Sequence, residues 1–425
     1  MKKFAMKYFL FFMIFSLLIV PVSFADGDDL KLVGEGILLM DYDSNRILYE
    51  KNSNERFYPA STTKIMTAIL AIELGKMNDI VEMDDDAIKL TEGSHIALDY
   101  KEKVRFEDLL NGLIVASAND AANAIAMHIS GSIEGFVGLM NAKAKELGAM
   151  NTNFVNPNGL HDDNHYTTAS DLYLISRYAM ENEVFRSFVS KREYTIPPTN
   201  KKKEARLLHT TNKFLYGREN MDLDGKIVPI KYEGIKGIKT GTTPEAKHCL
   251  VSYAQRDGKN MIAIVLKSQG KQVYADTVKL LDYGFDNFHP TFLGHSNEFI
   301  ENINIEDGSL PYASAVLNKD VYYLLKTDEI DRIKKNLKFK DKISPPIAEG
   351  DVLGSAEYYL DGNLIAKEDI VSTIEIKSVP KNKLLEFLID KWYLLIGLII
   401  VFLILIRGMF VFGKRKNRRH YSRYK

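Results

Sequence analysis

An apolar stretch near the C-terminus constrains the fold most, because it cannot remain exposed to water. Residues 392–406 carry no charge, Arg407 follows, and the apolar sequence then continues to residue 413. About 20 apolar residues suffice to cross a bilayer, and an arginine near a helix end can reach the headgroups. We therefore expect a membrane-anchoring helix over 384–412, with a helix lying in the membrane interface as the alternative.

The residues at the two ends predict how the chain is oriented. A basic tail, 413–425, follows the apolar stretch, and basic residues beside a span favour the cytoplasmic side. Residues 1–25 begin with lysines, continue as an uncharged apolar run and end on small residues, which predicts a signal peptide; a retained anchor is the alternative. We expect a protein of the cell membrane with an extracytoplasmic body and a short cytoplasmic tail.

Charge and cysteine content narrow the possible partners and chemistry of the body. The whole chain has a formal net charge of +0, and its two ends are basic, so the body between them is acidic. An acidic body argues against a nucleic-acid partner. Cys249 is the only cysteine, so no intramolecular disulfide can form. We expect it to be a small buried residue, with a nucleophilic thiol as the alternative.

The order of apolar patterns predicts an α+β body over 26–289, followed by a small β-rich domain over 290–380. Two strand-like runs flank a polar turn near residue 44, and a second pair flanks Asp257-Gly258, which predicts two hairpins. Helical periods lie between them, so early and late strands are expected to share one sheet. The predicted helices are 61–74, 106–116, 121–129, 133–147, 169–180 and 273–285.

Three short motifs carry the candidate chemistry. Ser61 and Lys64 form a Ser-x-x-Lys pair at the start of a predicted helix, Ser117-Ala118-Asn119 follows a helix, and Lys239-Thr240-Gly241 lies on a strand-like run. A Ser-x-x-Lys pair alone is weak evidence for a catalytic serine, and the presence of the other two motifs strengthens it. Three further Ser-x-x-Lys matches, which the other motifs do not support, begin at residues 268, 378 and 422.

These residue types suit nucleophilic catalysis. A serine hydroxyl needs a base, and residues three apart on a helix are neighbours, so Lys64 can reach Ser61. A lysine acts as a base only when burial or another cation, here Lys239, lowers its pKa. Gly241 would let a substrate backbone approach the strand edge, and Lys239 with the hydroxyls of Thr240 and Thr242 could hold a carboxylate.

The sequence resembles the D-alanyl-D-alanine carboxypeptidases, the low-molecular-mass penicillin-binding proteins. The segments that carry the resemblance are YPASTTKIMTA, VASANDAANAIA, FVNPNGLHDDNHYTTASDL and GIKTGTT, within roughly residues 30–285. The resemblance implies a penicillin-binding/transpeptidase-like domain, an antiparallel sheet with helices, followed by a β-rich domain and membrane attachment. It also implies peptidoglycan stem peptides as substrates, β-lactam antibiotics as inhibitors, and neither cofactor nor metal.

Carried over by position, the resemblance implies a role for each motif residue in the removal of the terminal D-Ala from a pentapeptide stem. Ser61 is the acylated nucleophile, Lys64 the general base and Ser117 a proton relay to the leaving group. Asn119 binds the substrate peptide amide. Lys239, Thr240 and Thr242 hold the terminal carboxylate, while the backbone N–H groups of Ser61 and Thr242 form the oxyanion hole. Thr242 departs from the histidine that family members often carry there.

Other functions stay open at this stage. A DD-endopeptidase acting on peptidoglycan crosslinks would use the same motifs. A β-lactamase is disfavoured, because no Glu-x-x-Leu-Asn pattern follows Asn119. A non-catalytic wall-binding protein is disfavoured because Ser61 and Lys64 are both present. A metal site is a further alternative, formed by His161, Asp162, Asp163 and His165.

Overall fold

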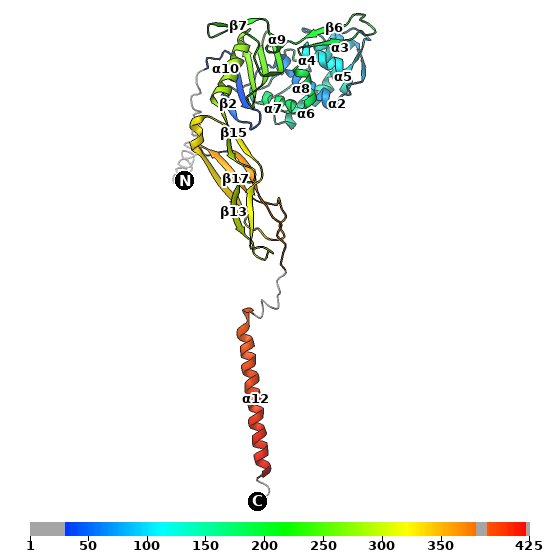
Figure 1. Ribbon diagram of the computed structural model, residues 1–425. Coiled ribbons are helices and arrows are strands. Elements are labelled where there is room, and N and C mark those ends of the chain that lie inside the picture. The colour runs from blue at the N-terminus through cyan, green and yellow to red at the C-terminus, as the bar shows by residue number, and fades with distance from the viewer. Residues whose placement is uncertain (1–29, 380–388, 422–425) are drawn as a thin grey trace, which may run out of the picture. The chain divides into compact units, whose positions relative to one another are not determined.

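The structure is a computed structural model that describes residues 30–379 and 389–421 (Figure 1). The predicted signal peptide lies outside the described residues. The chain divides into two compact units. The first consists of the residues up to Thr291 together with a short later segment, Leu324–Ile330. The second consists of Phe292–Tyr323 and the residues from Asp331 onward.

A five-stranded antiparallel sheet forms the centre of the first unit, with the strand order β2-β1-β11-β10-β9. Early and late strands therefore share one sheet, as the sequence predicts. The β10–β11 turn has positive φ at Asp257 and Gly258, 50° and 75°, which suits a two-residue hairpin. The strands are β1 (Gly36–Asp41), β2 (Ile47–Lys51), β9 (Ile235–Thr243), β10 (Lys247–Arg256) and β11 (Lys259–Ser268).

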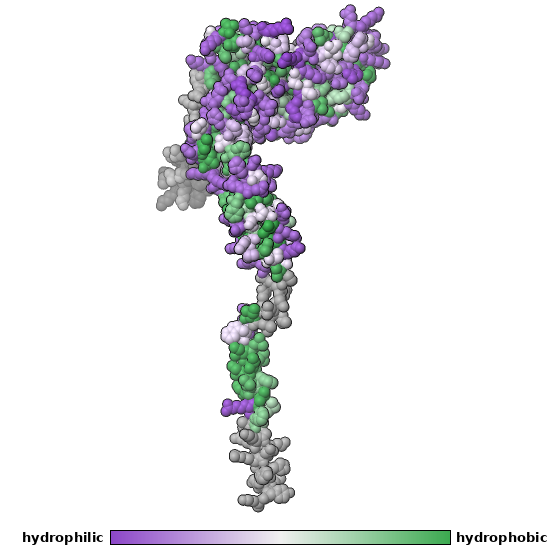
Figure 2. Space-filling view, viewed as in Figure 1, coloured by the Kyte–Doolittle hydropathy of each residue, from purple (hydrophilic) through white to green (hydrophobic). Residues whose placement is uncertain are grey.

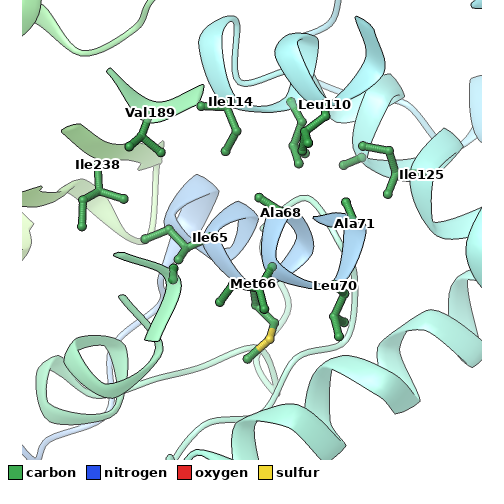
Figure 3. Close-up of a cluster of buried hydrophobic side chains, with 14 of the residues drawn as sticks. Ile65, Met66, Ala68, Leu70, Ala71, Leu110, Ile114, Ile125, Val189 and Ile238 are labelled. Atoms are coloured by element: carbon green, nitrogen blue, oxygen red, sulfur yellow. The ribbon is translucent and has the colours of Figure 1, made fainter. Parts of the chain in front are cut away.

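Helices complete the first unit around α2 (Lys64–Leu74), whose first eight residues are all buried. Figure 3 shows α2 surrounded by apolar side chains, among them Leu110, Ile114 and Val189. A helix buried on all sides holds its N-terminal residues firmly. The other helices are α3 (Asp85–Lys89), α4 (Phe106–Val115), α5 (Asn119–Ser130), α6 (Ile133–Glu146), α7 (Ala169–Glu181), α8 (Glu183–Val189), α9 (Lys213–Tyr216) and α10 (Gln272–Asn287).

The helix predicted over 61–74 begins later than expected. Ala60–Thr63 form a 3₁₀ turn, η1, and the α-helix starts at Lys64. Both the backbone N–H and the hydroxyl of Thr62 donate to the Pro59 carbonyl, at 3.3 and 2.7 Å. These bonds stabilise a tighter turn than an α-helix, as often happens at helix ends. Ser61 therefore lies in the 3₁₀ turn.

Several short elements have too few residues to produce a clear sequence period. The helix α8 and three two-stranded ladders belong to this group. The ladders are β3 (Ile80–Glu82) with β4 (Lys103–Arg105), β5 (Glu193–Ile196) with β6 (Arg206–His209), and β7 (Asn220–Leu223) with β8 (Lys226–Pro229).

The second unit is β-rich, as predicted, with a five-stranded sheet in the order β13-β14-β18-β17-β16. Its core contains Leu317, Ala356, Tyr358 and Ile370. The chain changes from one unit to the other in three elements, which are β12 (His289–Gly294), β15 (Val321–Leu325) and the 3₁₀ segment η2 (Thr327–Arg332). The sheet strands are β13 (Phe299–Asn304), β14 (Tyr312–Leu317), β16 (Ile333–Phe339), β17 (Val352–Leu360) and β18 (Asn363–Ser372).

The C-terminal helix α12 (Trp392–Tyr421) contains a 19-residue stretch, Trp392–Phe410, that is long and apolar enough to cross a membrane. Most side chains of Trp392–Phe410 are exposed, and Figure 2 shows this stretch as largely apolar. An exposed apolar helix of this length requires a non-aqueous environment, which suggests membrane anchoring.

Candidate active site

The Ser61 turn is held between two closely approaching segments. Ala60 has φ +49°, and Gly159 and Gly241 lie against it. A Cβ at Gly159 would lie 1.9 Å from the Ala60 carbonyl oxygen, and one at Gly241 would lie 3.0 Å from the Ser61 nitrogen. Only residues without a side chain fit here, so the edge strand β9 and the 156–159 turn fix the position of Ser61.

Lys64 joins three parts of the site through its amine. Its Nζ lies 2.8 Å from Ser61 Oγ, 2.6 Å from Asn119 Oδ1 and 2.6 Å from the backbone carbonyl oxygen of Asn158. The Asn119 amide is oriented by its Nδ2, which donates to the Glu92 carbonyl. Two of the three partners of Lys64 can therefore only accept a hydrogen bond, and the third is a hydroxyl.

Burial lowers the pKa of Lys64 well below its ordinary value. The nearby cation Lys239 lowers this pKa further, while the carboxylate of Asp120 acts in the opposite direction. A neutral amine has two N–H donors and one lone pair. These match two carbonyl acceptors and one hydroxyl donor, so the amine can accept the Ser61 proton without losing a hydrogen bond.

Ser117 and Lys239 form the second part of the cluster. Ser117 lies between α4 and α5 with φ +59°, and the Lys239 Nζ donates to its hydroxyl at 2.9 Å and to the Thr240 carbonyl at 3.0 Å. The turn is anchored by backbone bonds from Ala118 to Gly112 and from Asn119 to Ser94. Burial lowers the pKa of Lys239 to about 7.

The outer edge of β9 carries the remaining motif residues. Lys239 is buried, Thr240 is partly buried and Thr242 is exposed. The Thr240 hydroxyl lies 2.7 Å from the hydroxyl of Thr211, which follows β6. β9 is the last strand of its sheet, so outward-facing backbone groups lack a strand partner and are available to an extended peptide.

The structure brings the sequence-predicted residues together in two groups. Ser61, Lys64 and Asn119 meet at the Lys64 amine; Ser117, Lys239 and Thr240 meet at the Lys239 amine. Gly241 packs against Ser61, whereas Thr242 makes no side-chain hydrogen bond to the others in the described chain.

Three contributors were not predicted from the sequence: Asn158, Thr211 and Asp120. Asn158 lies in an Asn-Pro-Asn-Gly turn, which signals a turn but not its contact with a lysine 94 residues away. The Asp120 carboxylate accepts backbone N–H groups from Ile96 and Leu98 and thereby fixes the start of α5. Thr211 has no distinguishing local pattern, since only the fold places it beside Thr240.

The residues considered for a metal site have other roles. Both ring nitrogens of His165 are engaged: the Val155 N–H donates to Nδ1 at 3.2 Å, so Nε2 carries the proton and faces Thr63 Oγ1 at 2.8 Å. Burial lowers the His165 pKa to about 4, which keeps the ring neutral. Within residues 30–379 and 389–421, no group of three or more His, Cys, Asp or Glu side chains could hold a metal ion.

Cys249 is buried, and burial raises its pKa to about 12. A thiolate, the reactive form, is therefore scarce at neutral pH. This agrees with a small buried residue.

The antiparallel sheet with its surrounding helices, together with a partly buried serine held by a buried lysine, defines a penicillin-binding protein of the active-site-serine class. Comparisons with known proteins support this class. The D-alanyl-D-alanine carboxypeptidase family, peptidase S11, matches residues 26–270, and the C-terminal domain of penicillin-binding protein 5 matches residues 288–378.

Individual relatives extend over both units. The chain is 33% identical to the D-alanyl-D-alanine carboxypeptidase DacF of Bacillus subtilis over 384 residues, 88% of this chain and 94% of the relative. It is 30% identical to DacA of Haemophilus influenzae over 354 residues, 80% and 84% of the two chains. The crystal structure of penicillin-binding protein 5 from Haemophilus influenzae is similar, with a TM-score of 0.66, 28% identity and coverage of 82% and 98%.

The chain therefore belongs to the D-alanyl-D-alanine carboxypeptidase family. It is a serine-type D-Ala-D-Ala carboxypeptidase, as the motifs predict.

Proposed function

We propose that Ser61 is the nucleophile of this carboxypeptidase and Lys64 its general base. The supporting observation is the set of three contacts at the amine of the fully buried Lys64, 2.6–2.8 Å long, one of them to the partly buried Ser61 hydroxyl. The uncharged amine takes the Ser61 proton as Oγ attacks the substrate carbonyl. The resulting ammonium keeps its contacts with Asn119 and Asn158.

Ser117 and Lys239 serve the leaving group. As the bond to the terminal residue breaks, the Ser117 hydroxyl passes a proton to the leaving amine. Lys239, which donates to that hydroxyl at 2.9 Å, holds it in position. Water then hydrolyses the acyl ester on Ser61 and regenerates the free serine.

Substrate placement falls to Asn119 and the edge of β9. Asn119 binds the substrate peptide amide, and the terminal carboxylate lies near Lys239, Thr240 and Thr242. Gly241 leaves space for the substrate backbone beside the strand. The backbone N–H groups of Ser61 and Thr242 receive the developing oxyanion.

The substrate is the terminal D-Ala-D-Ala of a peptidoglycan pentapeptide stem, and β-lactams acylate the same serine. We further propose that residues 1–25 direct export, that 26–289 form the catalytic domain and that 290–380 separate it from the membrane. The helix within 384–412 anchors the enzyme, and the basic tail, 413–425, remains in the cytoplasm.

Labelled penicillin tests the nucleophile directly. We expect mass spectrometry of the digested protein to place a covalent adduct on Ser61. We also expect Ser61→Ala to abolish both the adduct and D-Ala release from a pentapeptide. Ser378→Ala, which changes an unrelated Ser-x-x-Lys serine, is the matched control and should retain both. An adduct on another residue, or release by Ser61→Ala, would refute the assignment.

A further inference from the structure

The 156–159 turn, which packs against Ala60, also supplies one of the two carbonyl oxygens at the Lys64 amine. That oxygen belongs to Asn158 and lies 2.6 Å from the amine. The turn is closed by the side chain of Asn156, which accepts the Gly159 N–H at 2.7 Å and donates to the carbonyl of residue 160 at 2.9 Å. These local bonds fix the shape of the turn, but they do not attach it to the helices that carry the catalytic residues.

Two side chains from outside the turn attach it to helices α2 and α5. The Thr67 hydroxyl, on α2, donates to the Pro157 carbonyl at 2.6 Å. The Asn123 Oδ1, on α5, accepts the Nδ2–H of Asn158 at 3.0 Å, and the Asn123 amide in turn donates to the Ala87 carbonyl at 3.4 Å. Thr67, Asn123 and Asn158 are only 0%, 2% and 3% exposed, so the loss of either attachment would leave a buried polar group without its partner.

The spacing along the two helices explains why these side chains reach the turn. Thr67 follows Lys64 by three residues on α2, and Asn123 follows Asn119 by four residues on α5. Residues three or four apart lie on the same face of a helix. α2 therefore provides the amine and α5 its first carbonyl acceptor, while Thr67 and Asn123, one turn further along, hold the segment that provides the second.

We propose that Thr67 and Asn123 are positioning residues for the acylation step, because they hold the Asn158 carbonyl against the Lys64 amine; this inference rests on the proposed role of Lys64 as general base. With both carbonyl acceptors in place, the two N–H bonds of the neutral amine are engaged, and its lone pair is directed at Ser61 Oγ. The proton of Oγ then moves to this lone pair as the Oγ–acyl bond forms. If the turn shifts, one N–H loses its acceptor, the amine can rotate, and proton transfer becomes slower.

The turn also affects the charge of Lys64. A carbonyl oxygen that accepts from the amine stabilises its charged form, so losing this contact lowers the pKa of Lys64 further. The charged groups that act on this amine are Lys239 on β9 and Asp120 on α5, and the neutral ring of His165 lies nearby. None of these three residues is changed in the test. A displaced turn should therefore move the acid limb of the pH profile of acylation to lower pH.

The test measures acylation of the full-length enzyme, in detergent, by a fluorescent penicillin. Thr67→Val removes the hydroxyl and keeps the shape of the side chain, whereas Thr67→Ser keeps the hydroxyl. Asn123→Ala removes the second attachment. The matched control is Thr277→Val, which removes an equally buried helical hydroxyl on α10, where Thr277 donates to the Val273 carbonyl at 2.7 Å. Circular dichroism establishes that each variant is folded.

We expect Thr67→Val and Asn123→Ala each to lower the acylation rate constant about tenfold, because the base is less well placed. The concentration of penicillin at half-saturation should stay unchanged, since neither residue contacts the residues proposed to bind the substrate carboxylate. The acid limb of the pH profile should move about 0.5–1 unit lower. Thr67→Ser and Thr277→Val should behave as the wild type. In a Lys64→Met background, Thr67→Val should cause no further loss, since it acts through Lys64.

Several results would overturn the proposal. They are a folded Thr67→Val variant that is acylated at the wild-type rate, a Thr67→Ser variant as slow as Thr67→Val, an unchanged pH profile, an equal loss in Thr277→Val, or a loss confined to the concentration at half-saturation. Failure of the underlying function is distinguishable, because Lys64→Met would then itself be acylated at the wild-type rate.

Discussion

Two buried lysines in the first unit and one surface lysine in the second have pKa values shifted in opposite directions. In the first unit, Lys64 and Lys239 are buried, form no ion pair within the described chain, and have lowered pKa values. In the second unit, Lys335 lies at the surface. Partial burial acts to lower its pKa, but the hydrogen bond to Glu298, at 2.9 Å, and other nearby groups outweigh this effect and raise the pKa. Burial thus favours the uncharged form of the same side chain in one setting, whereas a carboxylate partner favours the charged form in the other.

The physical difference is what replaces the hydration of the ammonium group. At Lys335 a carboxylate replaces it, so the charged form is retained. At Lys64 only neutral oxygens replace it, and a second cation lies nearby, so the uncharged form is favoured. Burial without a counter-ion generally indicates function, because it contributes little to stability.

The strongest test of this contrast is Lys64→Met, which keeps the length of the side chain and removes the amine. We expect the rate of acylation by penicillin to fall by about 10²–10⁴, the range for loss of a general base. The rate is measured with a fluorescent penicillin, and circular dichroism establishes that the variant is folded. Acylation of a folded variant at the wild-type rate would mean that another group takes the Ser61 proton.

A second test uses the pKa of Lys239, about 7. Above this pH the free enzyme loses the cation that we propose binds the substrate carboxylate. KM should therefore rise, by up to about tenfold for each pH unit well above 7. A substrate whose terminal carboxylate is amidated serves as the control, since its KM should be higher but independent of this proton. A KM that stays constant from pH 6 to 9 for the acid substrate would contradict the assignment.

The same pKa predicts that the stability of the fold increases with pH, whereas substrate binding weakens. Lys239 is neutral in the folded state above about pH 7, whereas an unfolded lysine stays protonated up to its ordinary value of 10.5. The unfolded state binds more protons in this window, so the burial penalty of Lys239 decreases as pH rises. Compared with Lys239→Met, the wild type should gain thermal stability from pH 7 to 10; a constant difference in Tm would show that the pKa is not lowered.

The smallest effect is expected for Lys335→Gln in the second unit. The ion pair with Glu298 is partly exposed, and such pairs contribute about 0–1 kcal/mol to the free energy of unfolding. Denaturant unfolding should show a change within that range, and acylation at Ser61 should proceed at the wild-type rate. A loss of acylation comparable to that of Lys64→Met would remove the distinction between the two kinds of lysine.

Much of the fold was accessible from the sequence because its elements are long. The 257–258 turn has the residues that a two-residue hairpin requires, and helices such as α4 and α7 have clear periods. The start of α2 was wrong by three residues, because the Thr62 bonds to Pro59 favour a 3₁₀ turn and no helical period reveals them. Short elements such as α8 were missed, since seven residues give little periodicity.

Only the motif residues of the candidate site could be predicted from the sequence. Ser61 and Lys64 are close in sequence, so their approach follows from local geometry. The Asn158 carbonyl and the Thr211 hydroxyl come from distant segments, with sequence separations of 94 and 29 residues from their partners.

The sequence by itself determined the family, the order of the three motifs and the presence of an apolar C-terminal segment, because these depend on residue identity and spacing. Tertiary structure decided the charge of Lys64, because desolvation and the distance to Lys239 are properties of the packed molecule. It also decided which Ser-x-x-Lys pair meets two carbonyl acceptors inside the core, and it placed the Thr211 hydroxyl beside that of Thr240. Residue types make the chemistry possible, while burial and proximity determine whether a lysine holds its proton.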